Sequence, residues 1–362
     1  MATTFKSLTT SDKVSTRTLL HEAIPLTGTI LSGTYSDNNI KNFSHGMFQS
    51  VYDYPYLSSS ANHIMDITVG YSADSSLSRS NSIQQSKKIN IYNQMAQVLV
   101  GHDHLGAVLK FDQDGDIVSG GTKLNECFFL NFSRLLTKDE IKKGSFAITV
   151  MTGGTYAART HDLVISDSGA ANDYRVNSPA GEYAVLYPEN GPSRGRKVGL
   201  IYYQAGIVVL TASLFGQGAQ AGASLTNPFH PTTASNYFGD GTVSGKVDTS
   251  VPAMLSGSEI SSSCNGFRNR LVNVAFNNTV ELNSTIYFCR AAHNEFNYSA
   301  NPTYLNSSKI RVKNESADSP VSYITTIGLF SADNEMMAVA KLSEPLKKDP
   351  TNELTLRVRL DY

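Results

Sequence analysis

The sequence predicts a mainly β protein built from antiparallel β-sandwich or barrel-like domains, with one longer helix, one short helix and an extended N-terminal arm. Short runs of alternating apolar and polar residues follow one another at close spacing and are separated by turn-forming residues. The aromatic residues are 18 Tyr and 16 Phe without Trp, a mixture typical of strands. This rhythm favours antiparallel sheets over alternating strand–helix units.

The clearest strand pattern lies in the last forty-odd residues. Apolar and polar residues alternate over 321–330, and the Ser-Ala-Asp-Asn-Glu segment 331–335 interrupts the run with turn formers. Strand patterns return over 336–342 and 354–361. We therefore expect a three-stranded antiparallel unit whose last strand is fixed by backbone hydrogen bonds.

Earlier strand patterns occur in close succession. They cover 63–71, 127–132, 146–151, 162–166, 183–187, 199–203 and 207–212. Later patterns cover 271–276, 285–290 and 309–313. A further hairpin is expected over 108–125, where apolar residues flank an Asp- and Gly-rich turn.

Two segments have helical patterns. Apolar residues recur at helical spacing within 82–100, which predicts the longer helix there; they are Ile91, Met95, Val98 and Leu99. Thr137 and Glu140 fit a capping box, and Gly144 fits a C-terminal stop. These signals predict the short helix over 138–143.

The chain divides into four ranges. Residues 1–45 are poor in apolar residues and are expected to form the N-terminal arm. Residues 46–214 form a β-rich domain that contains the longer helix. Residues 215–262 are rich in Gly, Ala, Ser and Thr and are expected to be an insertion or linker, and 263–362 form a C-terminal antiparallel β domain.

Composition limits the classes of function. Hydrophobic residues make up 40% of the 362 residues, which is enough for a packed core, and a formal net charge of −1 gives no basis for a nucleic-acid partner. No basic segment followed by an apolar one opens the chain, so no secretory signal is expected. The longest apolar stretch, 198–212, is interrupted by Gln204 and Gly206, which favours a buried hairpin over a membrane span.

The three cysteines, Cys127, Cys264 and Cys289, are scattered, so we expect reduced, packed thiols and neither a disulfide framework nor a zinc site.

Motifs that would indicate chemistry are incomplete. Asp112, Asp114 and Asp116 occupy the first acidic positions of a calcium loop, but Ile117 and Lys123 replace its required Gly and Glu. We interpret them as turn residues.

Two further patterns have equally plain interpretations. Gly191–Gly195 matches GxSxG, but Pro192 beside the serine and a strand after it indicate a hairpin loop. His102 and His104 could share a metal if extended, yet they follow the longer helix and fit a polar loop. No catalytic residue, cofactor-binding residue or metal site is expected, and the chain is not expected to be an enzyme.

Five segments of the chain form a recognisable combination, namely 44–64, 87–99, 198–211, 293–304 and 323–342. They resemble stretches of virion structural proteins of tailed bacteriophages. The resemblance is strongest to virion proteins of large contractile-tailed marine phages, such as those that infect cyanobacteria. The Ile-Gly-Leu-Phe and Met-Met-Ala-Val-Ala runs in the last segment are also similar in rhythm to a strand pair in baseplate-attachment domains of contractile-tail fibres.

The resemblance implies a structural component of the virion, assembled in the host cytoplasm, with the contractile tail or baseplate as the leading location. The expected partners are copies of the chain itself and other virion structural proteins, without nucleic acid, membrane or cofactor. Apolar residues in the arm and around the insertion are the candidate contact residues. They are Leu19, Leu20, Ile24, Leu26, Ile30, Phe215, Phe229 and Phe238.

Two alternatives remain open. One is a capsid decoration protein or a head–tail connector, which the sequence does not separate from a tail protein. The other is a module that binds a host glycan or receptor, because Tyr52, Tyr54 and Tyr56 could stack on sugars.

Overall fold

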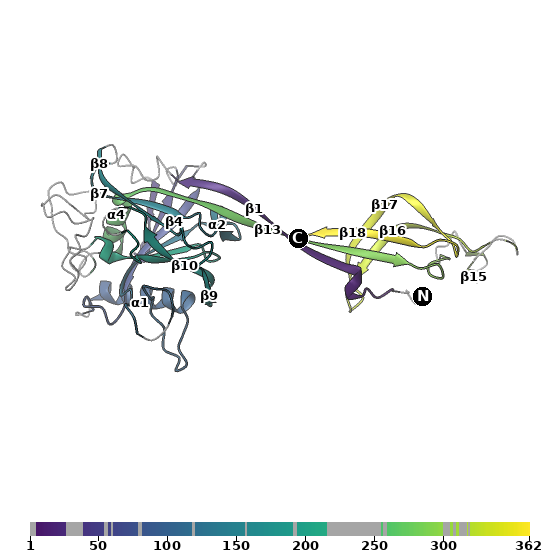
Figure 1. The fold of residues 1–362 in the computed structure, drawn as a ribbon, viewed down its shortest axis with the longest axis horizontal. Helices are drawn as coiled ribbons and strands as arrows, with labels where there is room; N and C mark the ends of the chain where they lie inside the picture. Colours follow the sequence, from purple (N-terminus) through teal and green to yellow (C-terminus); the bar gives the residue numbers. More distant parts are fainter. Residues whose placement is uncertain are drawn as a thin grey trace. The chain divides into compact units, whose positions relative to one another are not determined.

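The computed structural model describes residues 5–26, 39–53, 57–58, 61–78, 82–117, 120–155, 158–190, 194–215, 255, 259–299, 305–306, 309–310, 317 and 319–362. The chain forms two compact units. Unit 1 consists of Met1–Leu19 with Glu281–Tyr362, and unit 2 of Leu20–Val280. Two strands, β1 (Lys13–Leu26) and β13 (Leu271–Ala291), contribute residues to both units (Figure 1).

Unit 2 is a β structure, as expected. Its other strands are β2 (Ile40–Asn42), β3 (Gln49–Tyr52), β4 (His63–Tyr71), β5 (Glu126–Phe132), β6 (Glu140–Ile141), β7 (Ala147–Thr155), β8 (Ala158–Ser166), β9 (Arg175–Ser178), β10 (Gly181–Pro188), β11 (Gly199–Tyr202) and β12 (Ile207–Thr211). Hydrogen-bonded neighbours follow the order β13-β7-β8-β10-β11-β12-β5-β4-β3-β2, with β6 beside β13 and β9 beside β10.

The pairs between these strands are antiparallel. The predicted mainly β, antiparallel fold class is therefore confirmed.

The core of unit 2 lies between two parts of this strand order. The ring of Phe132 on β5 lies 5.4 Å from that of Phe276 on β13 and 6.0 Å from that of Phe146, which precedes β7. All three side chains are at most 2% exposed. The β5 part of the sheet thus packs face to face on the β7–β13 part, as in a sandwich.

The longer helix forms where the sequence predicts it. Helix α1 spans Ile83–Leu99, and the hydroxyl of Ser82 caps it by accepting a hydrogen bond from the backbone N–H of Gln85. A second helix, α4 (Ile260–Arg270), was not predicted. Its Ser- and Asn-rich sequence has a weak helical preference, and burial of Phe267 against Phe128 of β5 stabilises it.

The predicted short helix is wrong in position. Helix α2 spans Arg134–Thr137 and ends at Lys138, which has a positive φ of 55°. Glu140 and Ile141 form β6 instead and pair with Thr279 and Asn278 of β13. Ile141 is fully buried, so tertiary pairing overrides the local capping signal.

The expected extended N-terminal arm is not confirmed over Lys13–Leu26, because these residues form β1 beside β13. Within unit 2, His21 Nδ1 lies 3.1 Å from Thr279 Oγ1. Within unit 1, the hydroxyls of Ser15 and Thr285 lie 3.0 Å apart. Short polar side chains thus pair across the strands, and this cross-strand pairing leaves little apolar signal in the sequence.

Unit 1 contains a β-hairpin and a separate strand that pairs with β13. Strands β16 (Ser322–Phe330) and β17 (Met336–Lys348) pair with each other. Strand β18 (Leu354–Asp361) pairs with residues Ser284–Ala291 of β13 instead of continuing the meander, which corrects the expected three-stranded unit. A short pair, β14 (Leu305–Asn306) and β15 (Lys309–Ile310), completes the described strands.

Candidate functional site

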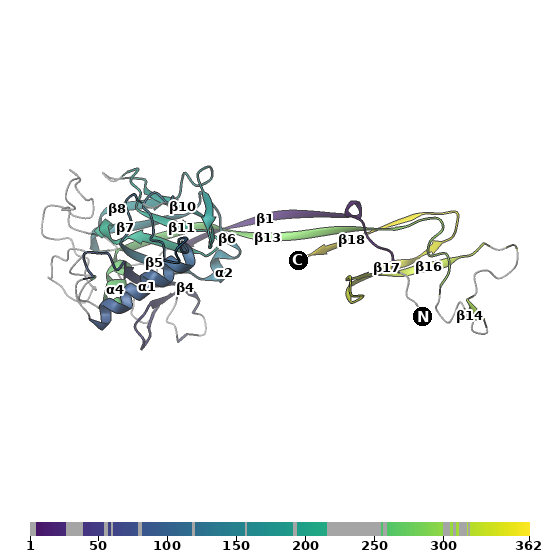
Figure 2. The same ribbon diagram turned by 90° about the horizontal axis from the view of Figure 1, so that it is seen from below.

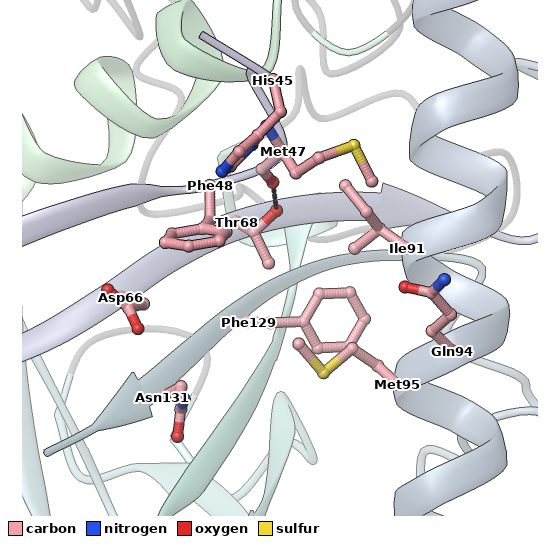
Figure 3. A pocket seen from close by; sticks show the side chains of 10 residues that line it. All are labelled: His45, Met47, Phe48, Asp66, Thr68, Ile91, Gln94, Met95, Phe129 and Asn131. Atoms are coloured by element: carbon pink, nitrogen blue, oxygen red, sulfur yellow. Dashed lines mark hydrogen bonds between the residues drawn. The ribbon is translucent and has the colours of Figure 1, made fainter. Parts of the chain in front are cut away.

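A hollow of about 400 Å³ lies beside helix α1 in unit 2 (Figure 3). Its lining residues are His45, Met47, Phe48, Asp66, Thr68, Ile91, Gln94, Met95, Phe129 and Asn131. In Figure 3 the ring of Phe129 lies in the middle, with Ile91 and Met95 of α1 on one side and Asp66 and Asn131 on the other. The hollow thus has an apolar side and a polar side.

Strand alternation and one glycine explain this hollow. Asp66, Thr68 and Gly70 share one face of β4, opposite Asn131, Phe129 and Cys127 of β5. A Cβ at Gly70 would lie 2.7 Å from the carbonyl oxygen of Lys88, so α1 approaches the sheet closely at that glycine. Helix α1 lies beside β4 and β5 (Figure 2), and the larger side chains farther along the two strands line the hollow (Figure 3).

A serine, an aspartate and a histidine meet at the polar side, a combination that sequence spacing did not single out. The Ser50 hydroxyl donates to Asp66 Oδ1 at 2.5 Å, and His63 Nε2 lies 2.8 Å from the same oxygen. In a catalytic triad the histidine lies between serine and aspartate and takes the proton of the serine. Here the carboxylate lies in the middle, so Ser50 does not contact His63 as the serine of a triad contacts its histidine, and the hydrogen bond from Ser50 to Asp66 joins β3 to β4.

The rim of the hollow is aromatic and held in place. The His45 ring stacks on Phe43 at 5.1 Å with an interplanar angle of 7°, and it also contacts Phe48 at 5.1 Å. The Lys87 ammonium donates to the His45 carbonyl, and the Thr68 hydroxyl donates to the Met47 carbonyl. These bonds fix a ring surface that a planar ligand could contact.

Two amides of the lining remain available for hydrogen bonding. The side chains of Gln94 and Asn131 make no hydrogen bond to the residues that the structure describes. An amide offers both donors and acceptors, so these groups could orient a polar ligand at the aromatic rim.

The three aspartates of the acidic turn lie close together, and a lysine of the same chain balances part of their negative charge. The carboxylates of Asp112, Asp114 and Asp116 offer oxygens within 4.8 Å of one another. Lys123, at the place where a calcium loop carries its Glu, forms a close ion pair with Asp112. The ammonium supplies the positive charge that a metal would bring, and burial raises the pKa of the Asp112 carboxyl.

The same segment has the expected hairpin character. Asp112 and Lys123 form an antiparallel bridge, and backbone hydrogen bonds join Gln113 to Thr122 and Leu124 to Phe111.

A buried lysine lies at the start of α1. Lys88 is fully buried, and its ammonium donates to the Leu255 carbonyl at 2.5 Å. Burial lowers the pKa of Lys88 to about 8, and it raises the pKa of the neighbouring Cys264 thiol. Both groups are enclosed, which suits a structural role.

The remaining sequence motifs have structural roles or lie outside the described part. Asp103, between His102 and His104, accepts hydrogen bonds from the backbone of Leu105 and Ala107, so these residues form the expected polar turn. Gly191–Ser193 of the GxSxG match lie outside the described residues. Among the described helices, none has the length and apolar character of a membrane span.

Unit 1 buries few of its described apolar side chains. Among its described residues only two apolar side chains are buried, Ala291 and Val358, and the hydrophobic core cluster belongs to unit 2. Its exposed large apolar residues are Phe5, Leu8, Val14, Leu19, Leu282, Phe296, Tyr298, Tyr323, Phe330, Met336, Met337, Val339 and Tyr362. Large contiguous apolar patches are typical of interaction sites.

The predicted contact residues are only partly described. Leu19 and Leu20 lie on β1 and are 44% and 51% exposed. Ile24 and Leu26 lie on the same strand, and Phe215 ends a 3-10 helix (Ala212–Phe215), but their side chains are outside the described part. Ile30, Phe229 and Phe238 lie outside the described residues altogether. The structure therefore brings none of the eight into a described common surface.

Comparison with protein-family models, with curated proteins and with solved structures gave no match to this chain.

Proposed function

We propose that the chain is a structural component of a tailed-phage virion, most specifically of the contractile tail or baseplate, and that it acts by assembling with copies of itself and with other virion proteins. The observation that carries this proposal is the apolar surface of unit 1. The sequence resemblance supplies the virion context.

The described part of unit 1 has a small apolar core, with Ala291 and Val358 as its buried apolar side chains. Burial of apolar surface contributes roughly 25 cal/mol per Å², and this term must offset the loss of conformational entropy on folding. In β18 the apolar positions Leu354, Leu356 and Leu360 remain half-buried, and only Val358 is buried. Neighbouring proteins would cover these positions and the exposed side chains, so assembly would complete the stabilisation of unit 1.

Unit 2 fits the same role as a rigid body. Its aromatic core is closely packed, and its Ser50, Asp66 and His63 side chains have the wrong order for nucleophilic catalysis. Both features favour a building block over an enzyme.

Mass spectrometry of purified, separated phage heads and tails tests the proposal. We expect peptides of this chain in the tail fraction at a stoichiometry of several copies per particle. Peptides in the head or neck fraction would favour the alternative of a capsid decoration or connector protein. Absence from all purified particles would contradict the virion role.

A glycan-binding module is a second candidate, which the hollow of unit 2 favours. The His45 and Phe48 rings and the Gln94 and Asn131 amides combine a stacking surface with polar groups, a combination that suits sugars. Tyr52, in contrast, packs against His63, and Tyr54 and Tyr56 lie outside the described residues. Binding to a glycan array that is lost with Phe48→Ala would support this candidate, and its absence would exclude it.

A further inference from the structure

The tip of the β16–β17 hairpin exposes a compact group of apolar side chains. The register shifts between Leu329 and Phe330, so Phe330 pairs with Met336 and Met337 is an extra residue of β17. This irregularity leaves both methionines exposed, Met336 at 60% and Met337 at 70%, next to Val339 at 59%. We call Phe5, Phe330, Met336, Met337 and Val339 the hairpin patch.

Contacts within unit 1 make the patch continuous. The ring of Phe330 lies over Gly328, because a Cβ at this glycine would be 2.8 Å from the ring. Gly328 is the register partner of Val339, and the Phe5 ring packs against Phe330 at 4.7 Å. The aromatic and aliphatic members therefore form one surface.

Opposite charges flank the patch along the hairpin. The turn before β17 carries Asp333 and Glu335, and Lys341 follows Val339 in the strand. All three residues are exposed, and their charged groups form no ion pair with the residues that the structure describes. Glu335 and Lys341 are six residues apart, about 20 Å in a strand, so they do not pair with each other within one chain.

We propose that the hairpin patch is the surface through which two copies of this chain associate, with the hairpins stacked antiparallel about a two-fold axis. In this arrangement the apolar side chains of the two copies cover each other. The acidic turn of each copy then lies near Lys341 of the other copy, so that one surface satisfies both its apolar and its charged groups.

A second copy fits the patch better than other occupants do. The patch has negative charges on one side of its apolar group and a positive charge on the other. A second copy rotated by 180° therefore places its positive side against the negative side of the first copy, and the surface is complementary to itself. Five side chains that each expose on the order of 100 Å² give an apolar area typical of functional patches. With the flanking charged residues, the area approaches the ~800 Å² per partner of a standard interface.

This inference rests on the proposed function, because it names a second copy as the neighbour that covers part of unit 1. Sedimentation equilibrium of the full chain tests it. We expect a concentration-dependent dimer whose dissociation constant rises about tenfold with Glu335→Lys or with Lys341→Glu, since each change places like charges together at two symmetric positions. The combined variant should return to within about threefold of the unmodified chain.

Substitution of apolar residues tests the contribution of the apolar contacts independently of the charges. Val339→Thr keeps strand preference and is expected to weaken the dimer about tenfold, whereas Val176→Thr on β9, where the valine is 67% exposed, should leave it unchanged. Circular dichroism confirms that each variant is folded.

A chain that stays monomeric at all concentrations would overturn the inference, as would a trimer or larger ring. A dimer that none of the variants affects would overturn it too. A monomer that is present in purified particles would contradict only this inference, and a dimer that is absent from particles would contradict only the proposed function.

Discussion

The carboxylate of Asp112 pairs with the side chain of Lys123, which stands where a calcium loop would carry a glutamate ligand. The fold removes its carboxylate from water to 2% exposure and places the Lys123 ammonium against it. Removal of one partner of a buried ion pair destabilises the folded protein, because an uncompensated buried charge remains. The pair therefore gives the acidic turn a structural role that does not require a metal.

The first prediction concerns this ion pair. Lys123→Met should lower the free energy of unfolding by about 3 kcal/mol. Lys110→Met is the matched control, because Lys110 pairs with Asp74 at the surface, where the loss should be below about 1 kcal/mol. Urea unfolding measures both values, and equal losses would contradict the assigned role.

The second prediction concerns Lys88 and pH. Its pKa of about 8 in the folded chain lies below the ordinary value of 10.5, so above pH 8 the folded state loses this proton while the unfolded state keeps it. Stability should therefore rise with pH between about 8 and 10.5, relative to Lys88→Met, by up to ~1.4 kcal/mol per pH unit. Unfolding curves of both proteins at pH 7, 8, 9 and 10 test this, and parallel pH profiles would refute it.

At the scale of the elements, the contact between α1 and β4 depends on a glycine. Gly70→Ala would place a methyl group 2.7 Å from the Lys88 carbonyl oxygen, and backbone cannot move aside cheaply. We expect a loss of about 2 kcal/mol in unfolding free energy. Gly169→Ala, whose new methyl would meet nothing within 4 Å, should be neutral or slightly stabilising. A comparable loss in both variants would show that helix packing is not the cause.

The elements that the sequence predicts well are those in which local pattern and tertiary environment agree. Helix α1 buries Ile91 and Leu99 of its predicted apolar face, although Val98 of that face is 61% exposed. Strands β4 and β12 are apolar runs that are buried at nearly every position. The short helix failed because β6 gains more from pairing with β13 than its capping signal offers. Helix α4 was missed because its buried side chains, such as Cys264 and Phe267, contact residues more than a hundred positions away in sequence.

The candidate sites follow the same division. The acidic turn could be assigned from sequence because its residues are adjacent, and Lys123 stands at the informative position. The hollow could not, because its lining comes from β4, β5, α1 and the segment before β3. The i, i+3 spacing of His63 and Asp66 was the one local signal, and Ser50 joins them only through the register of β3 and β4.

At the scale of the whole molecule, β1 decides how truncation acts. Removal of residues 1–26 would delete β1 and leave an unpaired edge on β13, so we expect lower thermal stability and aggregation. Removal of residues 1–4, which leaves Phe5, Lys6 and β1 in place, should leave thermal unfolding nearly unchanged. A soluble, cooperatively folded 27–362 fragment would contradict the role assigned to β1.

Strand β13 has a consequence for how the gene can change length. Its 21 residues alternate between two faces, and the strand contributes to both units. Insertion of one residue near Leu282 would move the side chains in the rest of β13 to the opposite face of the strand, whereas insertion of two residues would restore the original faces. Viable length variants of this strand should therefore differ by even numbers of residues.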